Sequence, residues 1–215
     1  YERARALLAG LPDRLDLRAY VDVVAGAIHI HRGEWASALV RITDDLEQRR
    51  RMGDWRSEML ALTQGHFMSL FSGDMASARA YLDQLERLEQ RLMDGRPLWT
   101  ARALGAQLDL RTGALTRAAT RVAEVDVLLA NNRDEATGVI PDALGALCAL
   151  RQGDRTAARR RAEKALARMR QNPPINYGGI EPVSGVIEVL VALWCEASGA
   201  DRGTLAAEIA AGMAI

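Results

Sequence analysis

A glycine recurs every 40 residues along this chain, and an alanine follows it five positions later each time. The glycines are Gly33, Gly73, Gly113 and Gly153, and the alanines are Ala38, Ala78, Ala118 and Ala158. A second glycine ladder keeps the same step at Gly65, Gly105, Gly145 and Gly185. Self-similarity at a fixed period of this length is typical of repeat proteins, in which each unit packs against its neighbours. The 215 residues therefore predict a continuous array of small units in a single domain, 1–215.

Each unit predicts two helices and a turn. In residues 96 to 130, apolar side chains recur at helical spacing on both sides of the Thr112-Gly113 turn. Pro97 suits the first turn of a helix, and Asn131 with Asn132 marks a turn. No stretch shows the sustained alternation of apolar and polar residues that indicates a strand. We expect an all-α fold of about five helical hairpins, with units near 16–52, 54–93, 96–130, 134–171 and 180–214.

The recurring residues have physical roles in such a hairpin. A glycine after the first helix can adopt the left-handed conformation that ends a helix. An acidic residue follows at Glu34, Asp74 and Asp154, where it suits the positive N-terminus of the second helix and can cap it. The recurring alanine leaves room where the two helices cross. The glycines inside the first helix cost about 1 kcal/mol each in helix propensity relative to alanine, so we expect close backbone packing there, against the partner helix.

Composition limits the classes of function. Apolar residues make up 49% and charged residues 26%, the balance of a soluble globular protein, and the formal net charge is zero. A dedicated binder of nucleic acid or anionic membrane would carry a basic excess, so we expect neither partner. No signal peptide and no apolar span of about 20 residues is visible, which favours a cytoplasmic protein. The chain opens in helical rhythm without methionine, and we expect a fragment of a longer protein.

The sequence carries no catalytic or metal-binding motif. It lacks the phosphate-loop, dinucleotide, zinc-protease and serine-hydrolase patterns. His29 and His31 are two positions apart and do not share a helix face, and His66 stands alone. Cys148 and Cys195 lie in apolar helical stretches and are interpreted as buried, reduced side chains. We therefore expect no enzyme, no catalytic residue, no metal site and no cofactor.

The recurring glycine and alanine positions resemble those of the tetratricopeptide repeat. That repeat is a helix–turn–helix unit of 34 residues with the pattern W-x2-L-G-x2-Y, A-x3-F and P. The segments LGAQL, 104–108, and LGALC, 144–148, match its L-G-x2-large part, and Ala38-x3-Ile42, Ala78-x3-Leu82 and Ala118-x3-Val122 match A-x3-large. The period of 40 and the missing proline column depart from the family. HEAT and armadillo repeats have closer lengths, about 40 to 47 residues, but do not explain the glycine and alanine columns. The resemblance implies a right-handed superhelix of hairpins.

Long-period arrays of this kind resemble the C-terminal helical regions of large bacterial signalling ATPases, including LuxR-type transcriptional activators and adenylyl-cyclase-linked regulators. The arginine- and alanine-rich composition and the ending NPPINYGG…VLVALWCEASG carry this likeness. It implies a non-catalytic interaction or regulatory scaffold that binds a protein, a peptide or neighbouring domains of the same chain. The alternative is an effector-sensing domain, in which a small molecule on the inner face controls an attached ATPase, cyclase or DNA-binding domain.

The resemblance also implies a binding groove, because such arrays bind partners on the concave face formed by the first helix of each pair. The corresponding positions around the interior glycines are Met59, Leu62, His66, Ser69, Trp99, Arg102, Asp109 and Asp142. Trp99, Arg102 and Asp109 share one helix face and would offer an aromatic ring, a cation and an anion together. Packing of Trp99 in the core or at the helix start is the alternative interpretation.

Three further segments predict local structure or partner contacts. Arg160, Lys164 and Arg168, with Arg161 close by, form a basic stripe that would suit an acidic partner, or else a solvated helix face. The terminal stretch TLAAEIAAGMAI, 204–215, is apolar for an end helix, and a homodimer through it would cover that surface. The prolines and glycines of 173–182 predict a loop before the last pair of helices.

Overall fold

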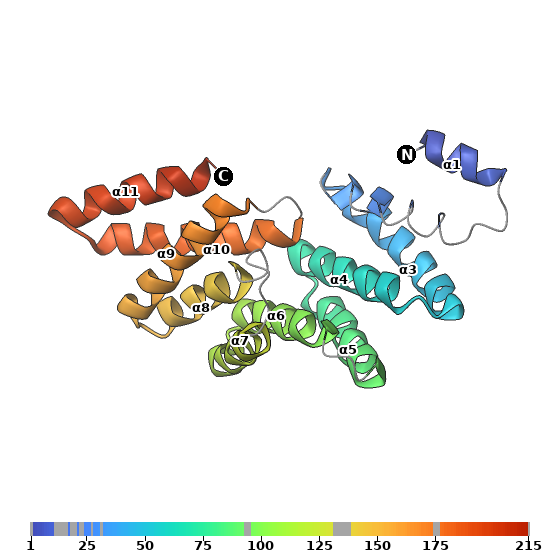
Figure 1. Cartoon of the computed structure of the whole chain (residues 1–215), viewed down its shortest axis with the longest axis horizontal. Coiled ribbons are helices and arrows are strands. Elements are labelled where there is room, and N and C mark those ends of the chain that lie inside the picture. The colour runs from blue at the N-terminus through green and yellow to red at the C-terminus, as the bar shows by residue number, and fades with distance from the viewer. Residues whose placement is uncertain are drawn as a thin grey trace. The chain divides into compact units, whose positions relative to one another are not determined.

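The computed structural model describes residues 2–10, 17, 21, 24–26, 28–30, 32–92, 96–130, 139–173 and 177–214, and within them the chain is helical without a strand (Figure 1). The all-α prediction is therefore confirmed for this part of the chain. No helix in these ranges is long and apolar enough to cross a membrane. The helices are α1 Glu2–Ala9, α3 Trp35–Met52, α4 Trp55–Ser72, α5 Met75–Leu92, α6 Arg96–Arg111, α7 Leu115–Leu129, α8 Val139–Arg151, α9 Arg155–Gln171, α10 Tyr177–Glu196 and α11 Gly199–Met213.

The chain divides into two compact units, Tyr1–Ala101 and Arg102–Ile215, and the division falls inside α6. In the first unit, α4 packs against both α3 and α5. In the second unit, α8 packs against α7, α9 and α10, and α11 packs on α10. Adjacent helices in each unit thus run as hairpins, which Figure 1 lets the reader follow from label to label.

The four predicted turn glycines lie at the hairpin turns in the left-handed conformation. Their φ angles are 71° at Gly33, 83° at Gly73, 77° at Gly113 and 86° at Gly153. At the α4–α5 turn, the N–H of Gly73 donates to the carbonyl of Leu70 at 3.3 Å. The next N–H, of Asp74, donates to the carbonyl of Ser69 at 2.8 Å. These two bonds satisfy carbonyls that the end of α4 would otherwise leave open, as in a Schellman cap.

The predicted acidic caps form at two of the three positions. The carboxylate of Asp74 accepts from the N–H of Ser77 at 3.0 Å, and that of Asp154 accepts from Ala157 at 2.9 Å. Glu34 makes no cap bond to α3, and its longer side chain instead pairs with His29 Nδ1. Asp54, which lies outside the recurring acidic positions, caps α4 in the same way: its carboxylate accepts from the N–H of Ser57 at 3.2 Å.

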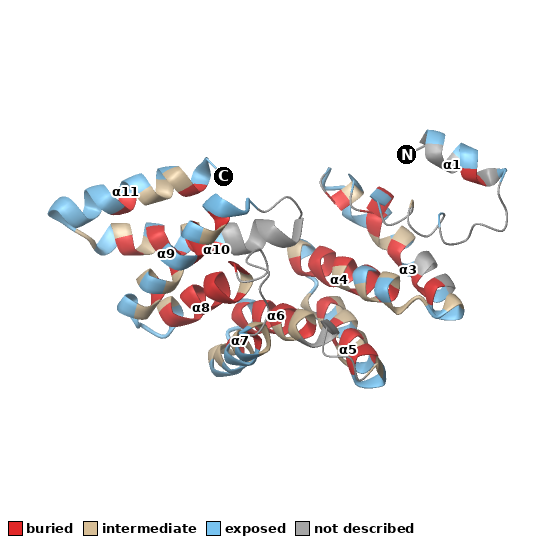
Figure 2. Ribbon diagram, viewed as in Figure 1, coloured by how far each residue is buried: buried red, intermediate tan, exposed pale blue. Residues whose placement is uncertain are grey.

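The recurring alanines lie where the helices touch. Ala38, Ala78, Ala118 and Ala158 all have 0% of their surface exposed. Figure 2 shows α8 and long stretches of α4 and α6 buried, while α5, α7 and α9 carry buried and exposed residues side by side. A larger side chain at these positions would push the paired helices apart, because helix axes that pack this closely leave no spare volume.

The interior glycines make room for side chains of the partner helix, and not for its backbone. Three of the four are crossed by the residue sixteen positions later: Gly65 by Tyr81, Gly105 by Arg121 and Gly145 by Arg161. A Cβ at position 65 would lie 2.6 Å from Cε1 of the Tyr81 ring, closer than real Cβ contacts occur. Gly185 differs, because the side chain above it is Leu147 of the preceding hairpin. The prediction of close backbone packing is therefore wrong in its agent: side chains, and not a backbone, occupy the space above these glycines.

The predicted loop over 173–182 is shorter than expected. Helix α10 begins at Tyr177, so Gly178, Gly179 and Pro182 belong to a helix, while 174–176 lie outside the described residues. The apolar stripe of α10 explains the difference, since Val186, Val189 and Leu190 are fully buried. Burial of such a stripe stabilises the helix. This gain is larger than the cost of the single backbone N–H that proline lacks.

We expect Gly65→Ala to destabilise the chain although alanine is the better helix former. The new Cβ has to displace the Tyr81 ring, at a cost of roughly 1–3 kcal/mol in the free energy of unfolding. Gly203 in α11 is the matched control, because a Cβ there meets nothing within 4 Å. Gly203→Ala should stabilise by about 0.5–1 kcal/mol. Urea denaturation measures both, and a stabilising Gly65→Ala would contradict the packing role.

The Asp54 cap predicts a pH-dependent loss of stability. Burial raises the pKa of this carboxyl, but the hydrogen bonds from Ser57 and Arg56 and the charge of Arg49 together outweigh it, so the pKa lies below its ordinary value of 3.8. A lowered folded-state pKa stabilises the fold above the ordinary value, and the benefit disappears as the pH falls through the folded pKa. Asp54→Ala should cost about 1 kcal/mol at pH 7 and progressively less below pH 3.8. Asp54→Asn, which keeps the cap acceptor, should stay close to wild type at pH 7 in the same denaturation series.

Candidate functional site

Most of the predicted groove residues are buried inside the helix packing. Five of the eight, Leu62, His66, Ser69, Asp109 and Asp142, have side chains that are almost fully covered. Met59, Trp99 and Arg102 are half-buried. The buried ring of His66 joins α4 to α5, because its Nδ1–H donates to the carbonyl of Ala78 at 2.9 Å. A partner lying on the described surface can therefore touch only the half-buried members of this set.

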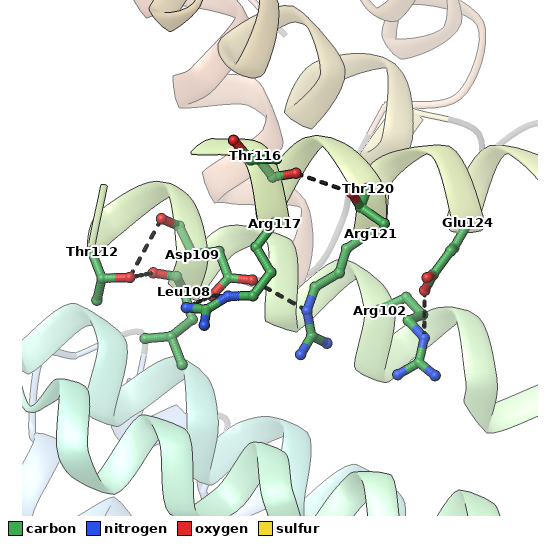
Figure 3. A network of polar contacts seen from close by, with 9 residues as sticks. All are labelled: Arg102, Leu108, Asp109, Thr112, Thr116, Arg117, Thr120, Arg121 and Glu124. Atoms are coloured by element: carbon green, nitrogen blue, oxygen red, sulfur yellow. Dashed lines mark hydrogen bonds and ion pairs between the residues drawn. The ribbon is translucent and has the colours of Figure 1, made fainter. Parts of the chain in front are cut away.

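Asp109 anchors a network of arginines between α6 and α7 (Figure 3). Arg117 donates to Oδ1 from Nε at 3.0 Å and from Nη2 at 2.8 Å. Arg121 Nε lies 3.2 Å from Oδ2, with its guanidinium crossing Gly105. The Asp109 side chain is 0% exposed, against 15% for Arg121 and 59% for Arg117. An ionised carboxylate at this depth has to be paired, and the two guanidiniums supply that pairing.

Two members of the predicted cluster, Arg102 and Asp109, pair with different residues of α7. Arg102 Nε pairs with Glu124 of α7 at 2.7 Å, while Asp109 pairs with other residues of the same helix. Figure 3 shows these as separate contacts spaced along the two helices. Both charged side chains therefore serve to join α6 and α7.

The predicted basic stripe on α9 pairs largely with the chain's own carboxylates. Lys164 Nζ donates to Asp142 Oδ1 at 3.0 Å, and Arg168 Nε lies 3.4 Å from Oδ2 of the same residue. Arg161 Nη2 donates to Asp126 at 2.8 Å. Arg160 is exposed and makes no ion pair with the described residues. Three of the four cations are thus committed within the chain.

A cleft in the first unit gathers arginines that the sequence analysis did not connect. It has a volume of about 320 Å³ and is lined by Arg50 of α3, Glu58 of α4, and Gln84, Arg87, Leu88 and Arg91 of α5. Glu58 accepts from Arg50 Nε and from Arg91 Nη2, both at 2.8 Å. Arg50 Nη2 also donates to Gln84 Oε1 at 2.7 Å. The three arginines come from separate turns of two helices, so only the spacing of Arg87 and Arg91 on one face could have hinted at the site.

A second cleft, in the other unit, has a balanced lining. It encloses about 490 Å³ beside α9, α10 and α11, and its charged lining residues are Arg155, Arg159, Arg160, Glu163, Glu196 and Asp201. Arg155 holds Glu196 through two bonds of 2.8 Å, and Arg159 pairs with Glu163 and Asp201. The hydrogen bond from Arg155 lowers the pKa of the Glu196 carboxyl. With three cations and three anions, this cleft offers a ligand no net charge.

The two cysteines differ in their surroundings. Cys148 is buried as predicted, and burial raises the pKa of its thiol to about 11 against the opposing effect of Arg161 and Arg151. Cys195 is exposed, so the prediction of burial is wrong there. It lies near the end of α10, beyond the stripe that packs into the core. The raised pKa of the buried Cys148 thiol disfavours its reactive thiolate form.

Comparison with known proteins gives no family for the chain. No protein-family model matches it, and no curated protein sequence matches it. Within the described residues, no group of three or more histidine, cysteine, aspartate or glutamate side chains is placed to hold a metal ion. The arginine-lined cleft of the first unit is the candidate site that the geometry offers.

We expect Asp109→Ala to be among the most destabilising changes in the second unit. Removing the carboxylate leaves Arg121 without its buried partner, at a cost of about 3 kcal/mol in the free energy of unfolding. Arg117→Ala should cost only about 1 kcal/mol, because Arg117 is largely exposed and Arg121 remains. In a double-mutant cycle by urea denaturation, Asp109→Ala and Arg121→Ala should be clearly less than additive. Additive losses would contradict the pairing.

Proposed function

We propose that the chain is a non-catalytic binding module, a tetratricopeptide-like solenoid within a larger bacterial signalling or transcription-regulatory protein. In this proposal the hairpins stack as a right-handed superhelix with a 40-residue period and present their surface to a protein, a peptide or a neighbouring domain. The repeated hairpin joint supports it most directly, because a left-handed glycine, a buried alanine and an interior glycine recur at one step. Repeat arrays with such joints serve as extended binding surfaces.

An exposed aromatic cluster gives this module an anchor for a partner. Trp35, at the start of α3, is 37% exposed, and its ring centroid lies 6.1 Å from that of Phe71 at the end of α4. Phe71 stacks in turn on Phe67, whose centroid is 5.8 Å away. A tryptophan held in place by neighbouring rings loses little entropy on binding, and tryptophan is enriched among residues that dominate interface energies.

A second candidate function, sensing of a small effector that controls an attached ATPase, cyclase or DNA-binding domain, is favoured by one observation. The cleft at Arg50, Arg87 and Arg91 is lined by three cations and a single anion. A polar cleft of this kind suits a small charged molecule better than a peptide.

Site-specific photocrosslinking in cells that make the whole protein tests the binding-module proposal. A photoreactive residue at exposed Ser37, beside Trp35, should trap one defined protein or one neighbouring domain, and the same residue at exposed Val127 of α7 serves as the control position. Excess wild-type chain should abolish the adduct. Trp35→Ala chain should compete about tenfold more weakly, since hot-spot truncation costs more than 1 kcal/mol.

Two results would contradict the proposal. One is an adduct at position 37 that excess wild-type chain does not compete, because such labelling is unspecific. The other is equal competition by the wild-type and Trp35→Ala chains, which would remove the aromatic anchor from the interface.

A further inference from the structure

A buried carboxylate holds two guanidiniums in place at the floor of the cleft between α3, α4 and α5. The Glu58 side chain is only 6% exposed, and each of its oxygens accepts from a different arginine at 2.8 Å. Gln84 fixes Arg50 further by accepting from Nη2 at 2.7 Å. A guanidinium carries five N–H donors, so Arg50 and Arg91 keep donors that these contacts do not use. Side chains already fixed by such contacts lose little further entropy when a ligand binds.

The cleft carries a surplus of positive charge. Among the described residues, its lining holds Arg50, Arg87 and Arg91 against the single charge of Glu58. Arg87 is exposed and makes no ion pair with the described residues, so none of them occupies its guanidinium. Arg50 and Arg91 are 42% and 62% exposed, which leaves their outer faces accessible from the cleft. Two positive charges therefore remain after the pairing with Glu58.

The charge and size together select a phosphate group as the ligand, and we propose that this cleft binds inorganic phosphate or a small phosphomonoester. A phosphomonoester carries a charge of about −1.5 to −2 at pH 7, which matches the surplus. Planar guanidinium forks match the geometry of phosphate oxygens. About 320 Å³ is the lower end of the range for small-molecule sites, and Leu88 is the single apolar lining residue. The cleft thus suits a compact polar ligand rather than a dinucleotide or a lipid.

Titration calorimetry on the full chain, with inorganic phosphate, glycerol 3-phosphate and glycerol at constant ionic strength, tests the site. We expect Kd values below about 1 mM for at least one of the two phosphates and no binding of glycerol. The tighter of the two phosphates identifies the source of the ligand. A chain that binds neither at 10-fold that concentration, roughly 10 mM, would overturn the proposal.

Arg87→Ala should weaken phosphate binding about tenfold or more, because it removes a charge-assisted donor pair from the ligand. Its thermal melting should stay close to wild type, since Arg87 supports no other described residue. Arg51→Ala is the matched control, because Arg51 neighbours Arg50 but pairs outside the cleft with Glu47 and is 76% exposed. Equal weakening by both variants would show unspecific screening and overturn the site. Arg87→Lys should recover only part of the affinity, because it restores the charge without the fork.

This inference names the ligand class for the second candidate function, effector sensing at the same cleft, and is independent of the proposed binding module. The calorimetry depends on Arg87 and its neighbours, whereas the photocrosslinking depends on Trp35. A chain that binds no phosphate would leave the crosslinking result intact, and the reverse also holds.

Discussion

The space above a glycine in the middle of a helix is the constraint on which these hairpins depend. At Gly65, Gly105 and Gly145 a side chain from the second helix crosses the first, where a Cβ would otherwise stand. Each such glycine costs about 1 kcal/mol in helix propensity, so the packing that it permits has to return more than that. In the α6–α7 hairpin the crossing side chain, Arg121, also reaches the buried Asp109. Close packing and charge pairing are therefore properties of the same contact.

That coupling explains why several polar residues with the spacing of a binding groove are structural. Asp109 and Asp142 lie on first helices among apolar neighbours, where an unpaired carboxylate would be costly. Each meets two cations from the second helix of its own hairpin. The acids and bases that appear from the sequence as candidate partner contacts thus satisfy each other across the hairpins.

The buried carboxylate of Glu58 is also paired with two cations, but positive charge is left over in its cleft. The two arginines come from α3 and α5 on either side of α4. Because they converge from two helices and Arg87 joins them, the cations line a hollow instead of lying along one helix. The cleft beside α9, α10 and α11 shows the contrast, since equal numbers of cations and anions line it. The proposed phosphate site rests on this surplus of positive charge beside an open volume.

The sequence by itself determined the positions of the turns, the buried alanines and the sites of closest helix approach. These follow from local chemistry, because only glycine readily takes a left-handed turn and only small residues fit where helices cross. The tertiary structure decided which charges meet. Glu58 pairs with residues 8 and 33 positions away, and a helical period places a side chain on a face without saying how far a flexible arginine reaches from the next helix. It also decided that α10 begins at Tyr177, because burial of an apolar stripe outweighs the local preference of glycine and proline for a loop.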